Sequence, residues 1–111
     1  MKGARVIMST HEAAEALSNN SAAQLALLVI DEAGQATDLQ ATMSLVNVVR
    51  SGGHLVLVGD PLQLPPTVMS KLALDKGLGV SIFERLQHAL RGQATAVTTL
   101  TIALRIFSHL V

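Results

Sequence analysis

The sequence predicts an α/β fold with a three-layer arrangement, in which helices cover both faces of a parallel sheet. The apolar run Leu25–Ile30 lacks the polar alternation of a strand that has one face in water, so both of its faces should be buried. A second apolar run, Leu55–Val58, follows later in the chain. The segment between them, 37–50, has apolar residues at helical spacing. Two buried strands joined by a helix form a parallel unit with a right-handed crossover.

Length and composition limit the fold to one small domain, 1–111. Of the 111 residues, 50% are hydrophobic, yet the only aromatic side chains are Phe83 and Phe107, so the core must be aliphatic. The absence of cysteine excludes a disulfide framework and cysteine-bound zinc, and it fits an intracellular protein. Nucleus and cytoplasm are not distinguished.

The charge pattern disfavours a self-sufficient nucleic-acid-binding module. The formal net charge is 0, the basic residues are scattered, and no aromatic side chains are interleaved to stack on bases. The longest apolar run is far shorter than the ~20 residues of a membrane helix, and the first residues lack the apolar core of a signal peptide. We therefore expect a soluble chain with no membrane partner.

The first predicted elements are a short strand, 4–8, and a helix after it. Ser9 and Glu12 have the spacing of a capping box for that helix. The helix over 37–50 begins with a second capping pair, Thr37 and Gln40, and Gly residues follow it. The apolar residues at helical spacing in this second helix are Leu39, Met43, Val46 and Val49. His54, before the second apolar run, is predicted to be exposed, because nothing nearby completes a metal site.

The C-terminal third predicts two helices and a strand. The first helix covers 68–76 and ends at Gly77, and the second begins at Ser81 with Glu84 as its capping partner. The buried stripe predicted for the second helix is Ile82, Phe83, Leu86 and Leu90. The β-branched residues of 98–102 then indicate a strand.

Polar side chains follow both apolar strands. Asp31 and Glu32 come directly after the first strand, and Gly59 and Asp60 follow the second. Because the carboxyl ends of parallel strands share one edge of a sheet, we expect these residues and Gln63 to meet there. Adjacent carboxylates at such an edge indicate a divalent cation or a reaction that needs a base. A solvated Asp-Glu pair at the end of a strand is the alternative.

These segments resemble motifs of superfamily 1 helicases. Val29–Ala36 is similar to the Walker B box, Leu57–Pro66 is similar to motif III, and 81–86 resembles the helix that follows motif III. The resemblance is to the up-frameshift and senataxin-like branch, whose members are ATP-driven motors on RNA or DNA. It implies that 1–111 is part of the first RecA-like domain of a P-loop NTPase, from Walker B to the arginine box. RNA and DNA both stay open as the substrate.

The resemblance also implies a role for each matching residue. Asp31 would hold the Mg²⁺ that accompanies ATP, and Glu32 would be the general base that orients the attacking water. Gly59, Asp60 and Gln63 belong to a nucleotide-binding motif. Within it, Gln63 would sense the terminal phosphate and Asp60 would help couple that signal to the nucleic-acid groove.

The chain departs from the family pattern at three places. Arg105 stands where the family's arginine contacts the terminal phosphate, but the Gln and Tyr of that box are replaced, so a solvated cation is the other interpretation. Thr10 matches a threonine that contacts nucleic acid in the family, but His11 and Glu12 follow it, so we expect it to be a helix cap and not a nucleic-acid contact. No Gly-x-x-x-x-Gly-Lys-Ser/Thr sequence occurs, so the ATP site is incomplete without a P-loop.

Three functions stay open. The chain is part of a helicase motor that hydrolyses ATP, inactive until the P-loop half and the second RecA-like domain are supplied. Alternatively, it is a truncated, non-enzymatic remnant that binds a protein partner, or an unrelated α/β domain with a chance match. We expect strands 4–8, 25–30 and 55–58 to be adjacent in that order. Without the P-loop strand, the side of 55–58 that faces away from 25–30 is an unpaired edge. The strand 98–102 either pairs with that edge or stays detached, which would leave the edge prone to self-association.

Overall fold

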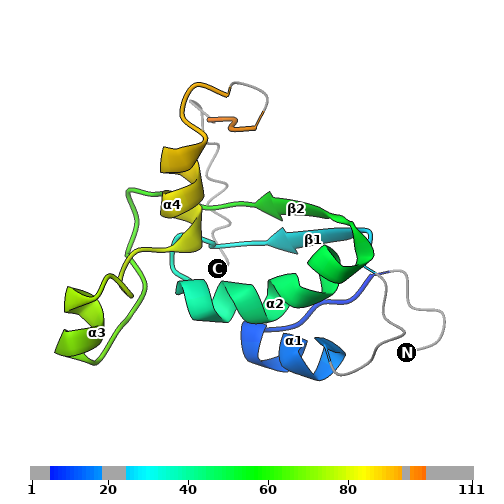
Figure 1. Ribbon diagram of the computed structural model, residues 1–111, viewed down its shortest axis with the longest axis horizontal. Helices are drawn as coiled ribbons and strands as arrows, with labels where there is room; N and C mark the ends of the chain where they lie inside the picture. The colour runs from blue at the N-terminus through cyan, green and yellow to red at the C-terminus, as the bar shows by residue number, and fades with distance from the viewer. Residues whose placement is uncertain (1–5, 19–24, 94–95, 100–111) are drawn as a thin grey trace, which may run out of the picture.

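The computed structural model describes residues 6–18, 25–93 and 96–99. The elements of this part are α1 (His11–Ser18), β1 (Leu27–Ile30), α2 (Asp38–Ser51), β2 (His54–Leu57), α3 (Lys71–Asp75) and α4 (Ile82–Ala89). Figure 1 shows α2 running along the two strands, α1 beside α2, and α3 standing apart from the strands. The predicted α/β fold is confirmed, and none of the described helices is long and apolar enough to cross a membrane.

The two strands are parallel neighbours, as predicted. Leu27 lies opposite His54 and Ile30 lies opposite Leu57. The alternation of a strand sends Leu28 and Ile30 toward one face of the sheet, together with the side chains of Leu55 and Leu57. These inward side chains form a core with small residues of the first loop and of α2, namely Ala33 and Ala41.

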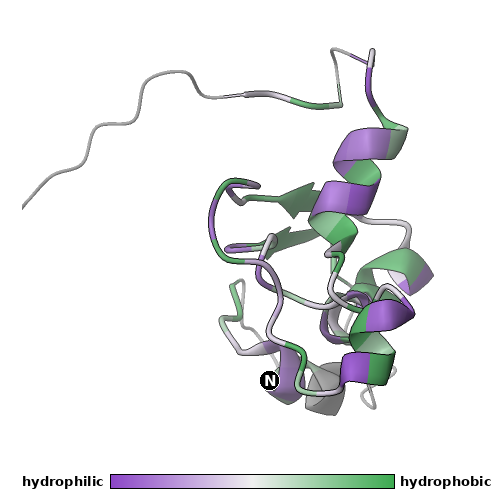
Figure 2. Ribbon diagram, turned by 90° about the vertical axis from the view of Figure 1, so that its left-hand side faces the viewer, coloured by the Kyte–Doolittle hydropathy of each residue, from purple (hydrophilic) through white to green (hydrophobic). Residues whose placement is uncertain are grey.

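The predicted three-layer arrangement is wrong for the described part of the chain, which has two layers. The outward residues of both strands, Leu27, Val29, Val56 and Val58, are 54%, 54%, 44% and 47% exposed. A run without polar alternation indicated strands buried on both faces. Among the described residues, however, helices α2 and α4 pack on one face of the sheet. The other face is apolar and exposed to solvent. Figure 2 shows the apolar character of both strands.

The capping chemistry of α2 agrees with the sequence. The side chain of Thr37 accepts a hydrogen bond from the amide of Gln40, and the side chain of Gln40 accepts one from the amide of Thr37 at 3.0 Å. At the other end, Gly52 adopts φ 64°, a left-handed conformation that glycine reaches without a steric penalty. Local residue chemistry therefore fixes both ends of the helix that covers the sheet.

The N-terminal prediction needs two corrections. Residues 6–8 of the predicted strand 4–8 have no regular secondary structure, and residues 4–5 lie outside the described residues. Val6 and Met8 are 78% and 93% exposed, and no strand in the described part of the chain pairs with this segment. The cap of α1 is Thr10 and not Ser9, because the Thr10 hydroxyl accepts a hydrogen bond from the amide of Ala13 at 3.3 Å. The capping interpretation of Thr10 is therefore the one that the structure supports.

The C-terminal elements follow the prediction in part. Helix α3 is shorter than the predicted 68–76, because the Ser70 side chain caps it by accepting a hydrogen bond from the amide of Ala73. Helix α4 begins after Ser81, as predicted, and its apolar stripe is half-buried and not fully buried. Residues 98 and 99 of the predicted strand 98–102 are not in a strand, and the remainder lies outside the described residues.

Candidate functional site

Two backbone hydrogen bonds join the ends of β1 and β2. The amide of Val58 donates to the carbonyl of Ile30 at 2.9 Å, and the amide of Ala33 donates to the carbonyl of Val58 at 2.8 Å. The loop that leaves β1 therefore continues the sheet contact one step beyond the strands. Gly59 lies against this loop so closely that a Cβ atom on it would be 3.0 Å from the amide nitrogen of Gly34.

This contact brings the predicted site residues of both strands to one edge. Asp31 and Glu32 lie on the loop after β1, whereas Asp60 and Gln63 lie on the loop after β2. All four side chains are exposed to solvent. The edge is therefore an open polar rim on an aliphatic core and not a buried carboxylate cluster.

The first loop is a tight turn with an unusual backbone at Glu32. Glu32 has φ 51°, in the left-handed region that residues with a side chain adopt at an energetic cost of about 1 kcal/mol or more. The Asp31 carboxylate compensates by accepting a hydrogen bond from the Glu32 amide at 2.9 Å, and the amide of Gln35 donates to the Glu32 carbonyl at 2.9 Å. The turn thus leaves two adjacent carboxylates exposed at the end of β1.

Each loop also holds a carboxylate against a glutamine three positions later. The side-chain amide of Gln35 donates to Glu32 Oε2 at 3.2 Å, and that of Gln63 donates to Asp60 Oδ2 at 3.3 Å. The other Asp60 oxygen, Oδ1, accepts a hydrogen bond from the amide of Leu62 at 3.0 Å. The sequence analysis gave Gln35 no role. The repeated carboxylate-x-x-Gln spacing in the two loops is the signal that could have identified it.

The rim offers exposed carboxylates but no complete set of metal ligands among the described residues. Among the described residues, no group of three His, Cys, Asp or Glu side chains could hold a metal ion. Magnesium is commonly bound by one or two protein carboxylates together with phosphate oxygens and water. Asp31, exposed at the end of β1, is suited to be such a carboxylate.

An ion pair and a backbone bridge join α4 to the start of α2, which follows the loop after β1. Arg85 Nη2 lies 2.7 Å from Asp38 Oδ2, and Thr37 and Ser81 form an antiparallel bridge. The second oxygen, Asp38 Oδ1, is buried and has no hydrogen-bond partner among the described residues. Sequence reasoning missed this pair, because its two residues belong to separate helices and no local pattern links them.

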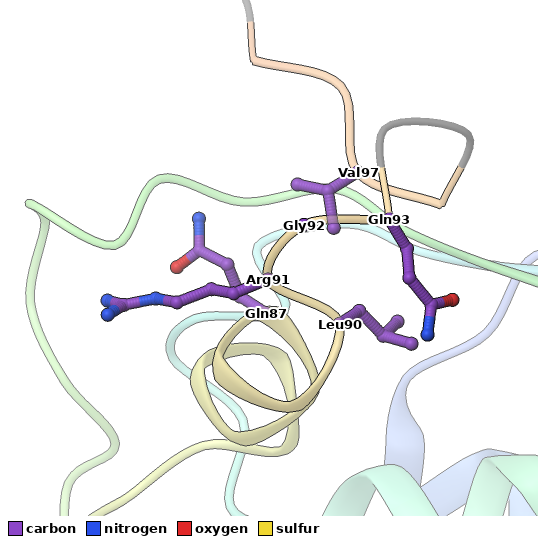
Figure 3. A pocket seen from close by; sticks show the side chains of 6 residues that line it. All are labelled: Gln87, Leu90, Arg91, Gly92, Gln93 and Val97. Carbon is purple, nitrogen blue, oxygen red and sulfur yellow. The ribbon is translucent and has the colours of Figure 1, made fainter.

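A hollow of about 430 Å³ lies at the far end of α4, away from the rim. Its lining residues are Gln87, Leu90, Arg91, Gly92, Gln93 and Val97, and Figure 3 shows their side chains around the turn that follows the helix. None of the predicted site residues that the structure describes is among them. Arg105, the remaining predicted site residue, lies outside the described residues.

Comparison with known proteins identifies the family. A family model described as an AAA domain matches residues 1–71, which include β1, α2, β2 and both loops of the rim. The chain belongs to the AAA domain family. This match includes the segments that resemble the Walker B box and motif III.

Several helicases match the same AAA domain chain over part of its length. RNA helicase Mov10l1 of Mus musculus is 46% identical over 57 residues, which are 51% of this chain and 5% of that helicase. The probable helicase MAGATAMA 3 of Arabidopsis thaliana is 46% identical over 63 residues, 57% of this chain and 7% of its own length. Helicase sen1 of Schizosaccharomyces pombe is 40% identical over 75 residues, 67% and 4% of the two lengths. The chain thus spans a small part of these helicases and corresponds to part of a superfamily 1 helicase domain.

Proposed function

We propose that residues 1–111 supply the Walker B and motif III edge of the first RecA-like domain of an ATP-driven helicase motor. One observation carries the proposal. The parallel ends of β1 and β2, joined by the hydrogen bond from Ala33 to Val58, present Asp31 and Glu32 beside Asp60 and Gln63 on one exposed rim. In parallel sheets, this edge is where nucleotides bind.

Each rim residue has a role that its contacts allow. Asp31 would hold Mg²⁺ together with phosphate oxygens, and the ion would neutralise charge on the phosphates of ATP. Glu32 would orient the attacking water as general base. Gln35 donates to one of its carboxylate oxygens, Oε2, so this contact steadies the side chain while the other oxygen can accept a hydrogen bond from water.

The second loop would report the state of the nucleotide. Gln63 would contact the terminal phosphate, and its hydrogen bond to Asp60 would transmit the change to the loop after it. Gly59 lets the loop after β2 contact the loop after β1. A displacement of either loop would therefore shift the other. Arg105 would add positive charge near the terminal phosphate.

Catalysis of this type depends on positioning and on charge stabilisation, so the phosphates of ATP must be bound firmly. The 111 residues contain no P-loop sequence, and the phosphate-binding groups must therefore come from other residues. We therefore expect no ATP turnover by the 111 residues alone. RNA is the nucleic acid that we favour, because two matching relatives, Mov10l1 of Mus musculus and of Homo sapiens, are named RNA helicases.

Grafting tests the proposal. The 57-residue segment of mouse Mov10l1 that matches this chain is replaced by the corresponding residues of this chain, and phosphate release is measured with and without RNA. We expect the graft to keep RNA-stimulated turnover within about 10-fold of the parent, because the rim residues perform the same tasks. A folded graft that binds RNA but does not turn over ATP would contradict the proposal.

A second candidate function is a non-enzymatic protein-interaction module. The open apolar face of the sheet, formed by Leu27, Val29, Val56 and Val58, favours it, because exposed apolar patches often mark protein contacts. This function would depend on the sheet face and not on the rim. Val29→Lys would then abolish partner binding, whereas Glu32→Gln would leave it unchanged.

A further inference from the structure

The loop after β1 is held at both of its ends. Its first half contacts the sheet, where the amide of Ala33 donates to the carbonyl of Val58 at 2.8 Å. Its second half ends at Thr37, the N-cap of α2, which forms an antiparallel bridge with Ser81. Ser81 is the N-cap of α4 and is only 2% exposed. Glu32, the proposed general base, lies in the loop that these contacts hold.

Arg85 adds an ion pair to the contact between the starts of the two helices. Its Nη2 lies 2.7 Å from Oδ2 of Asp38, the first residue of α2. The other oxygen, Asp38 Oδ1, is buried and has no hydrogen-bond partner among the described residues. The carboxylate therefore depends on Arg85 and on the N-terminal end of α2 to replace the water that it has lost. A neutral side chain at position 85 would favour rotation of Asp38 into solvent, away from α4.

The start of α4 contacts both the core and α2. Ile82 and Phe83 pack against the core, whereas Ser81 and Arg85 contact the start of α2. Figure 1 shows the opposite end of α4 extending past β2, away from α2. Loss of the ion pair should therefore loosen the start of α2 against α4 before it disturbs the sheet.

This contact reaches the proposed base through Gln35, which closely precedes Thr37 in the chain. The side-chain amide of Gln35 donates to Glu32 Oε2 at 3.2 Å, and its backbone amide donates to the Glu32 carbonyl at 2.9 Å. A shift of Thr37 and Asp38 away from α4 would therefore move Gln35 relative to Glu32. Small displacements of a catalytic group can remove much of its effect on the rate.

We propose that Arg85 is a positioning residue for ATP hydrolysis, which acts through Asp38 on the turn that holds Glu32. Arg85 contacts no reacting group in this role. The role in turnover rests on the proposed function, because Glu32 acts as a base only if the rim hydrolyses ATP. The support that Arg85 gives to the turn does not depend on ATP, and it can be measured separately.

The Mov10l1 graft, extended to residues 25–93 of this chain, tests the role in turnover. We expect Arg85→Met to lower kcat about 3- to 10-fold and to leave the KM for ATP unchanged, because the base is displaced while the phosphate-binding groups stay intact. Arg85→Lys, which keeps the charge, should restore most of the lost kcat. Arg91→Met removes an exposed arginine just after α4 and should leave kcat within about 2-fold, as a matched control.

A second comparison tests whether Arg85 acts through Asp38. Asp38→Asn keeps the size of the side chain but removes its charge, so it should lower kcat about as much as Arg85→Met. The double variant should lose no more than either single variant, since residues that act as a unit are not additive.

Amide hydrogen exchange in the complete chain tests the support of the turn without ATP. Arg85→Met should accelerate exchange at the Gln35 amide about 2- to 5-fold, as expected for a partly exposed ion pair. The amide of Val58, which donates to Ile30 in the sheet, should not change. If Val58 also exchanges faster, the chain has unfolded, and Asp38→Asn decides, because it should accelerate exchange at Gln35 alone.

Several results would overturn the proposal. They are equal kcat in Arg85→Met and Arg91→Met, additive losses in the double variant, a rise in KM in place of a fall in kcat, and unchanged exchange at Gln35 in the Arg85 and Asp38 variants. A parent graft that does not turn over ATP, with faster exchange at Gln35 in Arg85→Met, would refute the proposed function and the role in turnover. The support of the turn by Arg85 would then still stand.

Discussion

The amide of Ala33 donates to the carbonyl of Val58 at 2.8 Å, and this hydrogen bond ties the loop after β1 to the end of β2. The Asp31-Glu32 pair and the Asp60-Gln63 pair occupy one rim because of it. The core residue Ala33 is fully buried, so the bond is shielded from water while the carboxylates beside it are exposed. A rigid backbone contact thus supports a set of solvated side chains.

Gly59 should tolerate a side chain less well than Gly34, although both lie where the two loops meet. A Cβ atom at Gly59 would be 3.0 Å from the Gly34 nitrogen and 3.3 Å from the Ala33 nitrogen, whereas one at Gly34 would be 3.4 Å from the Asp60 carbonyl oxygen, an ordinary contact. We expect Gly59→Ala to lower the free energy of unfolding by about 1–3 kcal/mol, as overpacking does. Urea denaturation measures this, and an equal loss in Gly34→Ala would contradict it.

Thr37 should contribute more to stability than Thr42 on the same helix. The Thr37 side chain accepts a hydrogen bond from the Gln40 amide in the capping box, whereas the exposed Thr42 hydroxyl donates to the Asp38 carbonyl, which lies within the helix. Thr37→Ala should lower the free energy of unfolding by about 1 kcal/mol. Thr42→Ala is the control, with an expected change within about 0.5 kcal/mol. Thermal unfolding that ranks the two variants in the reverse order would argue against the cap.

The Asp38–Arg85 ion pair should stabilise the chain modestly and in a salt-dependent way. Its two nearest atoms are 2.7 Å apart, but the side chains are 32% and 59% exposed, so solvent screens the attraction. A double-mutant cycle with Asp38→Ala and Arg85→Ala should give a coupling of about 0.5–1 kcal/mol. The coupling should shrink in 1 M salt. A coupling that does not change with salt would show that packing and not charge joins these helices.

Helix α1 should weaken in acid because of Glu12. A hydrogen bond from the backbone lowers the pKa of Glu12 below its ordinary 4.5, and the Thr10 hydroxyl lowers it further. Since the pKa is lowered in the folded chain, the stabilisation is fully present above pH 4.5 and is lost as the pH falls through the folded value. Titration of the Glu12 side chain by NMR measures this value. Thr10→Val should move the pKa part of the way back, and a wild-type midpoint at or above 4.5 would contradict the account.

Local patterns predicted the local features of the fold. The apolar runs became β1 and β2 in parallel, and the Thr37-Gln40 spacing marked the start of α2, because strand burial and helix capping depend on neighbouring residues. The strand predicted at 4–8 is not confirmed in its described residues, since a strand needs a partner that sequence composition does not supply. For the same reason, the open face of the sheet could not be foreseen from apolarity.

The candidate site was predictable in position but not in detail. The rule that parallel strands share their carboxyl edge brought Glu32 and Asp60 together in the prediction. The ion pair of Asp38 with Arg85 joins segments distant in the chain, and no sequence spacing encodes it. The left-handed backbone of Glu32 is held by local hydrogen bonds to Asp31 and Gln35, but no glycine marks it in the sequence. The hydrogen bond between Glu32 and Gln35 could have been predicted from the sequence, because the same three-residue spacing of a carboxylate and a glutamine recurs in the second loop.

The most direct test of the central claim is ATP turnover by the Mov10l1 graft with a single rim carboxylate changed. Glu32→Gln keeps the size of the side chain and its contact with the turn but removes the base, whereas Glu12→Gln, made in a graft extended to include α1, changes an exposed carboxylate on that helix. We predict that Glu32→Gln lowers kcat by about 10²-fold or more and that Glu12→Gln leaves it within 2-fold, as expected for loss of a general base. Equal turnover by the two variants, with RNA binding intact in both, would contradict the assignment of this rim as the site of ATP hydrolysis.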